Sequence, residues 1–88
     1  MNEKKVYIWQ LANFLATNGM VMSGEELADH LNRNDFLTSY GTEYQGGRGT
    51  YKLISQTYHW LLDELKLEKE AGKVAVAFVK PDGTYPYK

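Results

Sequence analysis

Two stretches with helical apolar spacing, separated by a turn-rich connector, constrain the fold of this chain more than any other feature. Residues 26–32 (ELADHLN) and 50–62 (TYKLISQTYHWLL) place apolar residues at intervals of three and four. Between them, residues 33–49 contain the Asn-Asp, Ser-Tyr-Gly and Gly-Gly combinations that are typical of turns. The sequence therefore predicts a short helix, a compact connector and a longer helix, with the rest of the chain supporting them.

Length and composition predict a single domain. A chain of 88 residues is near the lower size at which a domain folds unaided, so residues 1–88 are expected to share one core. Hydrophobic residues make up 43% of the sequence, which is enough to form that core. The sequence contains no cysteine, which excludes disulfides, thiolate zinc sites and a cysteine nucleophile. The longest apolar run, Val74–Val79, is too short to cross a membrane, so we expect a cytoplasmic protein with no membrane partner.

A first helix is predicted for residues 3–18. Trp9 lies at the edge of its apolar face and is expected to pack into the core. Asn18-Gly19 supplies a stop signal, because glycine adopts the left-handed cap conformation without steric cost. The apolar positions that recur at helical spacing are Tyr7, Ile8, Leu11, Ala12, Phe14 and Leu15.

A second helix is predicted to begin after Ser23. Ser23 and Glu26 have the spacing of a capping box, in which each side chain accepts a hydrogen bond from the backbone N–H of the other residue. The helix is expected to run to about Asn32. Its predicted buried positions are Leu27, Ala28 and Leu31.

The connector and the third helix follow. Phe36–Thr38 and Thr42–Tyr44 flank a turn, which is compatible with a short β-hairpin, and Phe36 and Leu37 are expected to anchor the connector. Thr50 is the predicted N-cap of the third helix, which should extend to about residue 66. Its apolar face would comprise Leu53, Ile54, Tyr58, Trp60, Leu61, Leu62 and Leu65.

The C-terminal residues fit two patterns. Ala71, Val74, Ala75, Phe78 and Val79 recur at helical spacing, which favours a fourth helix over residues 68–79. Val74, Val76 and Phe78 also alternate before a good turn sequence, which would suit a β-hairpin over residues 73–87. The fold class predicted is mainly α, with about four helices in a helix-turn-helix arrangement and a short hairpin in the connector. The alternative is a winged helix with a C-terminal β-hairpin.

The charge is small and uneven. The net charge is −1, which is not typical of proteins that bind nucleic acid by bulk electrostatics. Residues 1–44 carry three basic and six acidic side chains, whereas residues 45–88 carry seven basic and five acidic ones. The second half is therefore the side expected to face phosphate.

The central unit resembles a known DNA-binding segment. The pattern formed by Leu27-Ala28, Leu31-Asn32, Thr38, Gly41 and Tyr44 is similar to the helix-turn-helix that follows the catalytic domain of serine recombinases. Asp35 stands where that pattern prefers glycine, and residues 45–48 are an insertion. The resemblance covers residues 26–62 and carries no catalytic domain with it. It implies the geometry for reading DNA, not recombination.

Polar residues of the third helix are the candidate DNA readers. A recognition helix enters the major groove with its N-terminal residues against base edges. Glutamine can pair bidentately with adenine and lysine with guanine. The candidates are Lys52, Ser55, Gln56 and His59, which share one stripe of the helix. The alternative is that this stripe is an ordinary solvated face.

The loop before the third helix is the candidate phosphate contact. Arg48 and the backbone amides of Gly46, Gly47 and Gly49 would meet a phosphate at the helix start, where the helix dipole favours anions. The first functional hypothesis is therefore a small bacterial or phage protein that binds double-stranded DNA, as a transcriptional regulator or an accessory factor of a mobile element.

The tyrosines suggest a second hypothesis. Tyrosine is favoured at protein interfaces because it offers a large contact area at low entropic cost. Those outside the clear core positions are Tyr40, Tyr44, Tyr51, Tyr85 and Tyr87. They either form an interface with a protein partner or a second copy of the chain, as in a phage effector that binds a host protein, or they pack the connector and the tail.

Nothing in the sequence indicates catalysis. His30 and His59 have no cysteine and no paired acid at the spacing of a metal site or a catalytic triad. We therefore expect no enzymatic activity, no cofactor, no metal and no small-molecule substrate.

Overall fold

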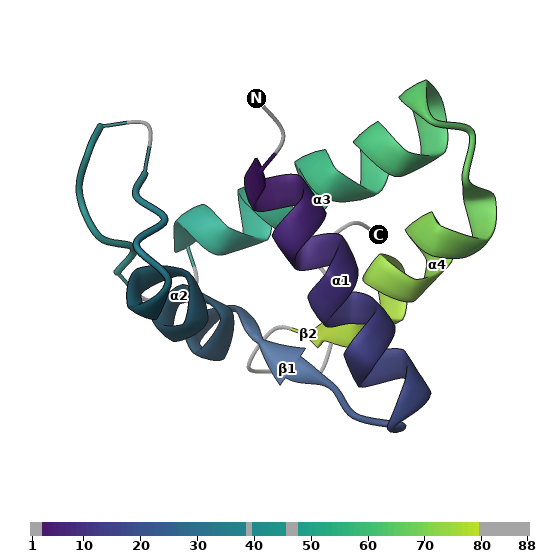
Figure 1. Ribbon diagram of the computed structural model, residues 1–88, viewed down its shortest axis with the longest axis horizontal. Coiled ribbons are helices and arrows are strands. Elements are labelled where there is room, and N and C mark those ends of the chain that lie inside the picture. The colour runs from purple at the N-terminus through teal and green to yellow at the C-terminus, as the bar shows by residue number, and fades with distance from the viewer. Residues whose placement is uncertain (1–2, 39, 46–47, 80–88) are drawn as a thin grey trace.

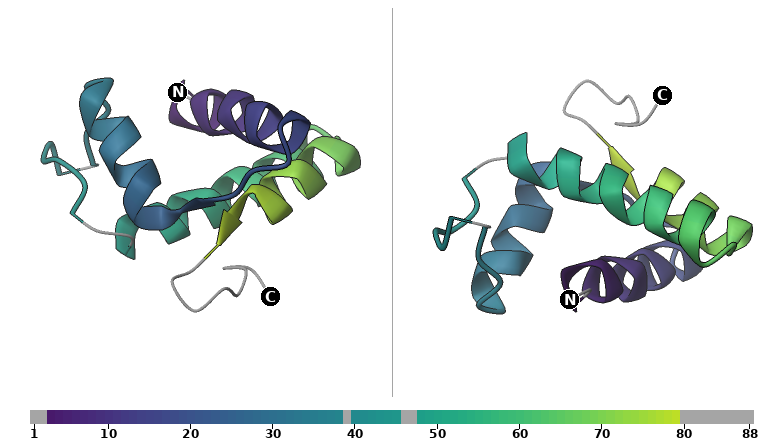
Figure 2. Two further views of the ribbon diagram at one scale, coloured as in Figure 1. Left: turned by 90° about the horizontal axis from the view of Figure 1, so that it is seen from below. Right: turned by 90° about the horizontal axis from the view of Figure 1, so that it is seen from above.

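The computed structural model describes residues 3–38, 40–45 and 48–79, which form a mainly helical fold. Helix α1 (Glu3–Thr17) lies across α3 (Arg48–His59) and α4 (Glu68–Ala77), while α2 (Gly24–Arg33) stands at one end beside the start of α3 (Figures 1 and 2). Strands β1 (Met22–Ser23) and β2 (Phe78–Val79) pair with each other in parallel. The prediction of a mainly α fold with four helices is confirmed.

Helix α1 ends as the sequence predicts. Gly19 has a φ of 63°, and the N–H groups of Gly19 and Met20 donate to the carbonyls of Ala16 (3.3 Å) and Leu15 (2.9 Å). This pattern is a Schellman motif, which satisfies the last carbonyls of the helix. Phe14 does not belong to the buried face, since it is 58% exposed. The residues of α1 that are buried are Ile8, Ala12 and Leu15, and Trp9 is partly buried against the core.

The capping box of α2 is present. The N–H of Glu26 donates to Ser23 Oγ (3.2 Å), and the N–H of Ser23 donates to Glu26 Oε1 (3.3 Å). All three predicted core residues of α2 are buried: Leu27, Ala28 and Leu31. After the helix, Asp35 takes a φ of 61°, which lets the N–H of Phe36 bond the carbonyl of Leu31 (2.9 Å).

The connector forms a turn rather than the predicted hairpin. The N–H of Thr38 donates to the carbonyl of Thr42 (2.8 Å), and no strand is assigned in residues 33–38 and 40–45. The backbone N–H groups of Thr42 and Tyr44 donate to the side chains of Thr38 (3.3 Å) and Asn32 (2.8 Å), so these bonds take the place of a strand ladder. Phe36 packs against the ring of Tyr7 at 5.3 Å between centroids, as predicted for an anchor. Leu37, the other predicted anchor, is exposed.

Helix α3 begins earlier than predicted, so Thr50 is not its N-cap. The helix starts at Arg48, and the buried Thr50 hydroxyl donates to the carbonyl of Gly24 in α2 (2.9 Å). Buried apolar residues of α3 include Leu53 and Ile54. The hydroxyl of Thr57 is also buried and bonds the carbonyl of Leu53 (2.8 Å), which satisfies it within the helix.

A wider helical turn, η1 (Trp60–Glu64), continues α3. The N–H of Leu65 donates to the carbonyl of Trp60 (3.1 Å), which is the i→i+5 bond of a π-helix. The indole of Trp60 packs edge-on against that of Trp9, with centroids 6.1 Å apart.

The C-terminal ambiguity is resolved for the described residues. Residues 68–77 are helical, so residues 73–77 do not form the first strand of a hairpin. The fourth helix ends two residues earlier than predicted, because Phe78 and Val79 pair in parallel with Met22 and Ser23. The remainder of the alternative hairpin, residues 80–87, lies outside the described residues. None of the described helices has the length and apolar character needed to cross a membrane.

Candidate nucleic-acid interface

The polar stripe of α3 faces outward. Lys52, Gln56 and His59 are exposed, and Ser55 between them is half-buried. Helical spacing of four and three places the three exposed residues on one side of the helix. His59 Nδ1 lies 3.4 Å from Asp63 Oδ2, so a carboxylate lies next to the C-terminal end of the stripe. The predicted candidates of α3 therefore do share one surface.

The predicted phosphate loop is only partly described. Gly49 is exposed in the first turn of α3, where helical N–H groups lack intrahelical partners. Gly46, Gly47 and the side chain of Arg48 lie outside the described part of the chain.

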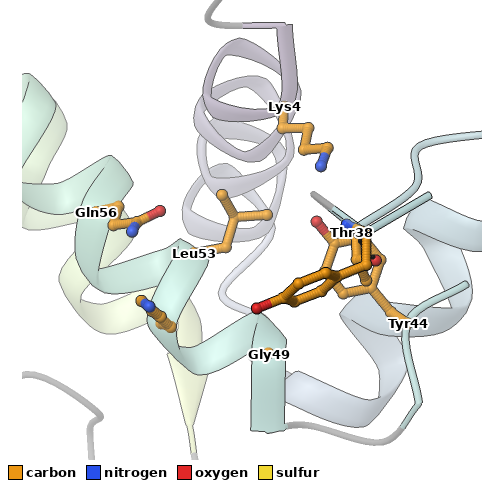
Figure 3. Close-up of a pocket in the computed structure, with 8 residues that line it drawn as sticks. Lys4, Thr38, Tyr44, Gly49, Leu53 and Gln56 are labelled. Carbon is orange, nitrogen blue, oxygen red and sulfur yellow. Dashed lines mark hydrogen bonds between the residues drawn. The ribbon is translucent and has the colours of Figure 1, made fainter. Parts of the chain in front are cut away.

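A cleft of about 390 Å³ lies beside the start of α3. Figure 3 shows Lys4 reaching toward it from α1, with Thr38 and Tyr44 on the connector side and Leu53 and Gln56 on the α3 side. The described residues that line it are Lys4, Thr38, Tyr40, Tyr44, Gly49, Lys52, Leu53 and Gln56. The first helix, the connector and α3 thus meet at one concave surface.

The described residues that line this cleft carry positive charge and include no carboxylate. The charged ones among them are Lys4 and Lys52, and neither forms an ion pair within the described residues. Thr38, Tyr40 and Gln56 add hydroxyl and amide groups that can donate hydrogen bonds. The cleft is therefore suited chemically to an anion.

The tyrosines divide between packing and exposure. Tyr44 is buried, and its backbone N–H and carbonyl bond the side chain of Asn32 (2.8 and 2.9 Å). The hydroxyl of Tyr51 accepts from the N–H of Gly24 (3.2 Å) and donates to the carbonyl of Val79 (3.0 Å). For these two residues the structure favours the packing alternative. Tyr40 is 91% exposed, and Tyr85 and Tyr87 lie outside the described residues.

Sequence reasoning identified Lys52, Gln56 and Gly49 but did not identify Lys4, Thr38 or Leu53 as members of the site. Lys4 lies in a different helix, and nothing local in the sequence indicates that α1 packs beside the start of α3. A signal was available only in part: Lys4 is a cation in the first turn of a helix, where acidic residues are preferred. Its position there is consistent with a role other than helix stabilisation.

The described residues contain no group of three or more histidine and acidic side chains that could hold a metal ion. Comparison of the chain with protein-family models, with curated proteins and with solved structures finds no match.

Proposed function

We propose that this protein binds double-stranded DNA through the exposed stripe of α3 and the cleft beside its first turns. The observation that carries this proposal is the meeting of Lys4 and Lys52, from separate helices, in a cleft that no carboxylate of the described residues lines. Phosphate contacts of this kind supply most of the affinity of proteins for DNA. The net charge of −1 is compatible with it because none of the acids among the described residues lies on this lining.

The helix pair α2 and α3 also supports the proposal. α2 packs against α3, and Thr50 and Tyr51 of α3 both bond Gly24 at the start of α2. Asp35 adopts the left-handed conformation that glycine favours, at the position where the recombinase-type pattern prefers glycine. A role as a transcriptional regulator or an accessory factor of a mobile element would follow from such binding.

Binding of a fluorescent duplex of mixed sequence, measured by anisotropy over a salt series, tests the proposal. We expect a dissociation constant of roughly 10⁻⁴–10⁻⁶ M near physiological salt, and tighter binding at low salt. Lys52→Ala should weaken binding, because it removes a cation from the cleft. Lys69→Ala removes an exposed lysine of α4 with the same change in net charge, and should have little effect. A wild-type protein that shows no binding at tens of micromolar in low salt would contradict the proposal.

A second candidate function is binding of a protein partner or a second copy of the chain. The observation that favours it is the exposure of Phe14, Met20 and Val21 by half or more, near the C-terminal end of α1. Large apolar side chains gathered on a surface mark sites of interaction. Sedimentation of the wild type and of Phe14→Ser tests self-association. A monomer in both cases, at concentrations up to the millimolar range, would exclude a homodimer at this surface.

A further inference from the structure

Lys4 is held in place by a chain of contacts that starts in α2. The side chain of Asn32 fixes the backbone of Tyr44 with two hydrogen bonds, and the Tyr44 ring is buried. Lys4 Nζ lies 5.4 Å from the centroid of that ring, at the distance of a cation–π interaction. The ammonium group is therefore partly ordered over the cleft before any ligand arrives, which lowers the entropic cost of binding.

The groups opposite Lys4 belong to the first turns of α3. Lys52 supplies a second cation and Gln56 supplies an amide. Gly49 has no side chain, so it leaves the backbone at the start of the helix uncovered on this side. The lining also contains two mostly buried residues, Leu53 and Tyr44. An anion in the cleft would therefore meet one lysine from α1 and one from α3.

We infer that the cleft holds one phosphodiester group of the DNA backbone between Lys4 and Lys52. The inference rests on the proposed function and specifies how it is carried out. Lys52 and Gln56 then contact the backbone, not base edges, because they line a concave surface together with α1 and the connector. The sequence hypothesis had made them base readers. Binding through this part of α3 is consequently independent of DNA sequence, and Lys4 is a phosphate-binding residue.

The salt dependence of duplex binding tests this inference. Each phosphate contact adds about 0.9 to the negative slope of log K against log salt. Lys4→Ala should reduce the slope by about 0.9 or somewhat less and weaken binding equally for duplexes of different sequence. Lys4→Arg should keep the slope, and Lys69→Ala should leave it unchanged. The circular dichroism and thermal midpoint of each variant show that it is folded.

A double-variant cycle tests whether the two lysines share one phosphate. If they do, Lys4→Ala combined with Lys52→Ala should lower the slope by clearly less than the sum of the two single changes, because both act on the same group. Additive changes in slope would overturn the shared site. An unchanged slope in Lys4→Ala, with a reduced slope in Lys52→Ala, would overturn the role of Lys4 and leave the proposed function standing. A wild-type protein that binds no duplex would contradict both the role of Lys4 and the proposed function.

Inorganic phosphate is the alternative ligand, because it carries the same anionic group as the DNA backbone. Titration with inorganic phosphate at constant ionic strength, followed by the side-chain amide resonance of Gln56, measures it directly. We expect no saturable shift below tens of millimolar, since a lone phosphate lacks the remaining contacts of a duplex. Saturable binding at lower concentration that Lys4→Ala abolishes, while duplex binding is unaffected, would assign the cleft to free phosphate and overturn the DNA assignment.

Discussion

Gly24 is the residue on which the contact between α2 and α3 depends most. A Cβ atom built on it would lie 2.7 Å from Tyr51 Cζ and 2.8 Å from Thr50 Oγ1. Real Cβ atoms do not approach other atoms so closely, so a side chain here would push the two helix starts apart. The same movement would break the bonds from Gly24 to Tyr51 and from Thr50 to Gly24. Glycine is required by the close approach of two helices, not by a positive φ.

Gly24→Ala is therefore expected to lower the free energy of unfolding by about 1–3 kcal/mol, the usual cost of overpacking. Gly72→Ala is the matched control, because a Cβ there meets no atom within 4 Å. Gly72 lies inside α4, where alanine is the better helix former, so this control should be stabilised by about 0.5–1 kcal/mol. Urea unfolding followed by tryptophan fluorescence measures both. A loss of stability in Gly72→Ala equal to that in Gly24→Ala would contradict the steric explanation.

Single residues also show where sequence reasoning stops. Ser23 was assigned correctly because both partners of its capping box are three residues apart and need no tertiary contact. Thr50 has the residue type of an N-cap, but its hydroxyl bonds the carbonyl of Gly24 in another helix. Buried hydroxyl groups take whichever partner the tertiary structure supplies, and that choice is not encoded locally.

Among the elements, α1 and α4 are joined by a polar contact as well as by apolar packing. Trp9 Nε1 donates to Glu70 Oε1 (2.8 Å), and Lys73 Nζ lies 3.1 Å from Glu70 Oε2. The same ammonium donates to Asn13 Oδ1 (2.9 Å). These hydrogen bonds, that of Trp9 first and that of Lys73 second, lower the pKa of the Glu70 carboxyl below its ordinary value. The ionised carboxylate is thus the form that stabilises the fold.

Stability should fall in acid partly through Glu70. Because its pKa is lower in the folded protein, the unfolded chain binds the proton first as the pH falls below about 4.3. The contribution of Glu70 is present above that pH and is lost as the pH falls through the folded pKa. Glu70→Gln should therefore be less stable than the wild type at pH 7, and the difference should shrink toward pH 3.

Urea unfolding at several pH values measures this difference. Glu64→Gln is the control, since Glu64 is exposed and no hydrogen bond to its carboxylate is seen within the described residues. The difference between Glu64→Gln and the wild type should be small at every pH. A stability gap for Glu70→Gln that stays constant from pH 7 to pH 3 would show that the ionisation of Glu70 does not contribute to the stability of the fold.

The helices could be predicted because their signals are local, whereas the pairing of β1 with β2 could not. Apolar spacing predicted all four helices with bounds within a few residues of those observed, and Gly19 predicted the end of α1. The parallel pair joins Met22 to Phe78, and each strand has two residues, too few for an alternating pattern. The π-turn at Trp60–Glu64 was missed for a similar reason, since its apolar residues fit an ordinary helix as well.

At the scale of the whole molecule, Phe78 completes the core. It is fully buried and is the first residue of β2, directly after the end of α4. Apolar residues from every described helix belong to the same buried cluster, including Ile8, Leu27, Ile54 and Val74. A core shared in this way should unfold as one unit.

Phe78→Ala is expected to cost about 3–5 kcal/mol, as for other buried phenylalanines. Domains of this size are often stable by only about 5–15 kcal/mol, so the variant should unfold at much lower urea in a single transition. Val76→Ala, at a site that is half exposed in α4, should change stability little. Far-ultraviolet circular dichroism and tryptophan fluorescence should report the same midpoint. Separate midpoints for the two probes would show that the helices do not share one core.

The candidate site, too, is a property of the whole molecule. Lys52 and Gln56 could be predicted from the sequence because they share one helical stripe. Lys4 and Thr38 join them only through the packing of α1 and the turn of the connector, which the local sequence does not specify. What the sequence could not show is therefore the concavity of the surface, and concavity decides whether a lysine meets a phosphate or a base edge.

The parallel pairing of β1 with β2 has a consequence for the order in which the protein is made and folded. Met22 can form its strand pair only after the ribosome has added Phe78, which follows all four helices in the chain. Until then, α1 and α2 can pack against α3 but lack the pairing of β1 with β2 and the buried Phe78 side chain. Such long loop closures slow folding. A chain that has not yet reached Phe78 should therefore be more sensitive to proteases than one that includes it.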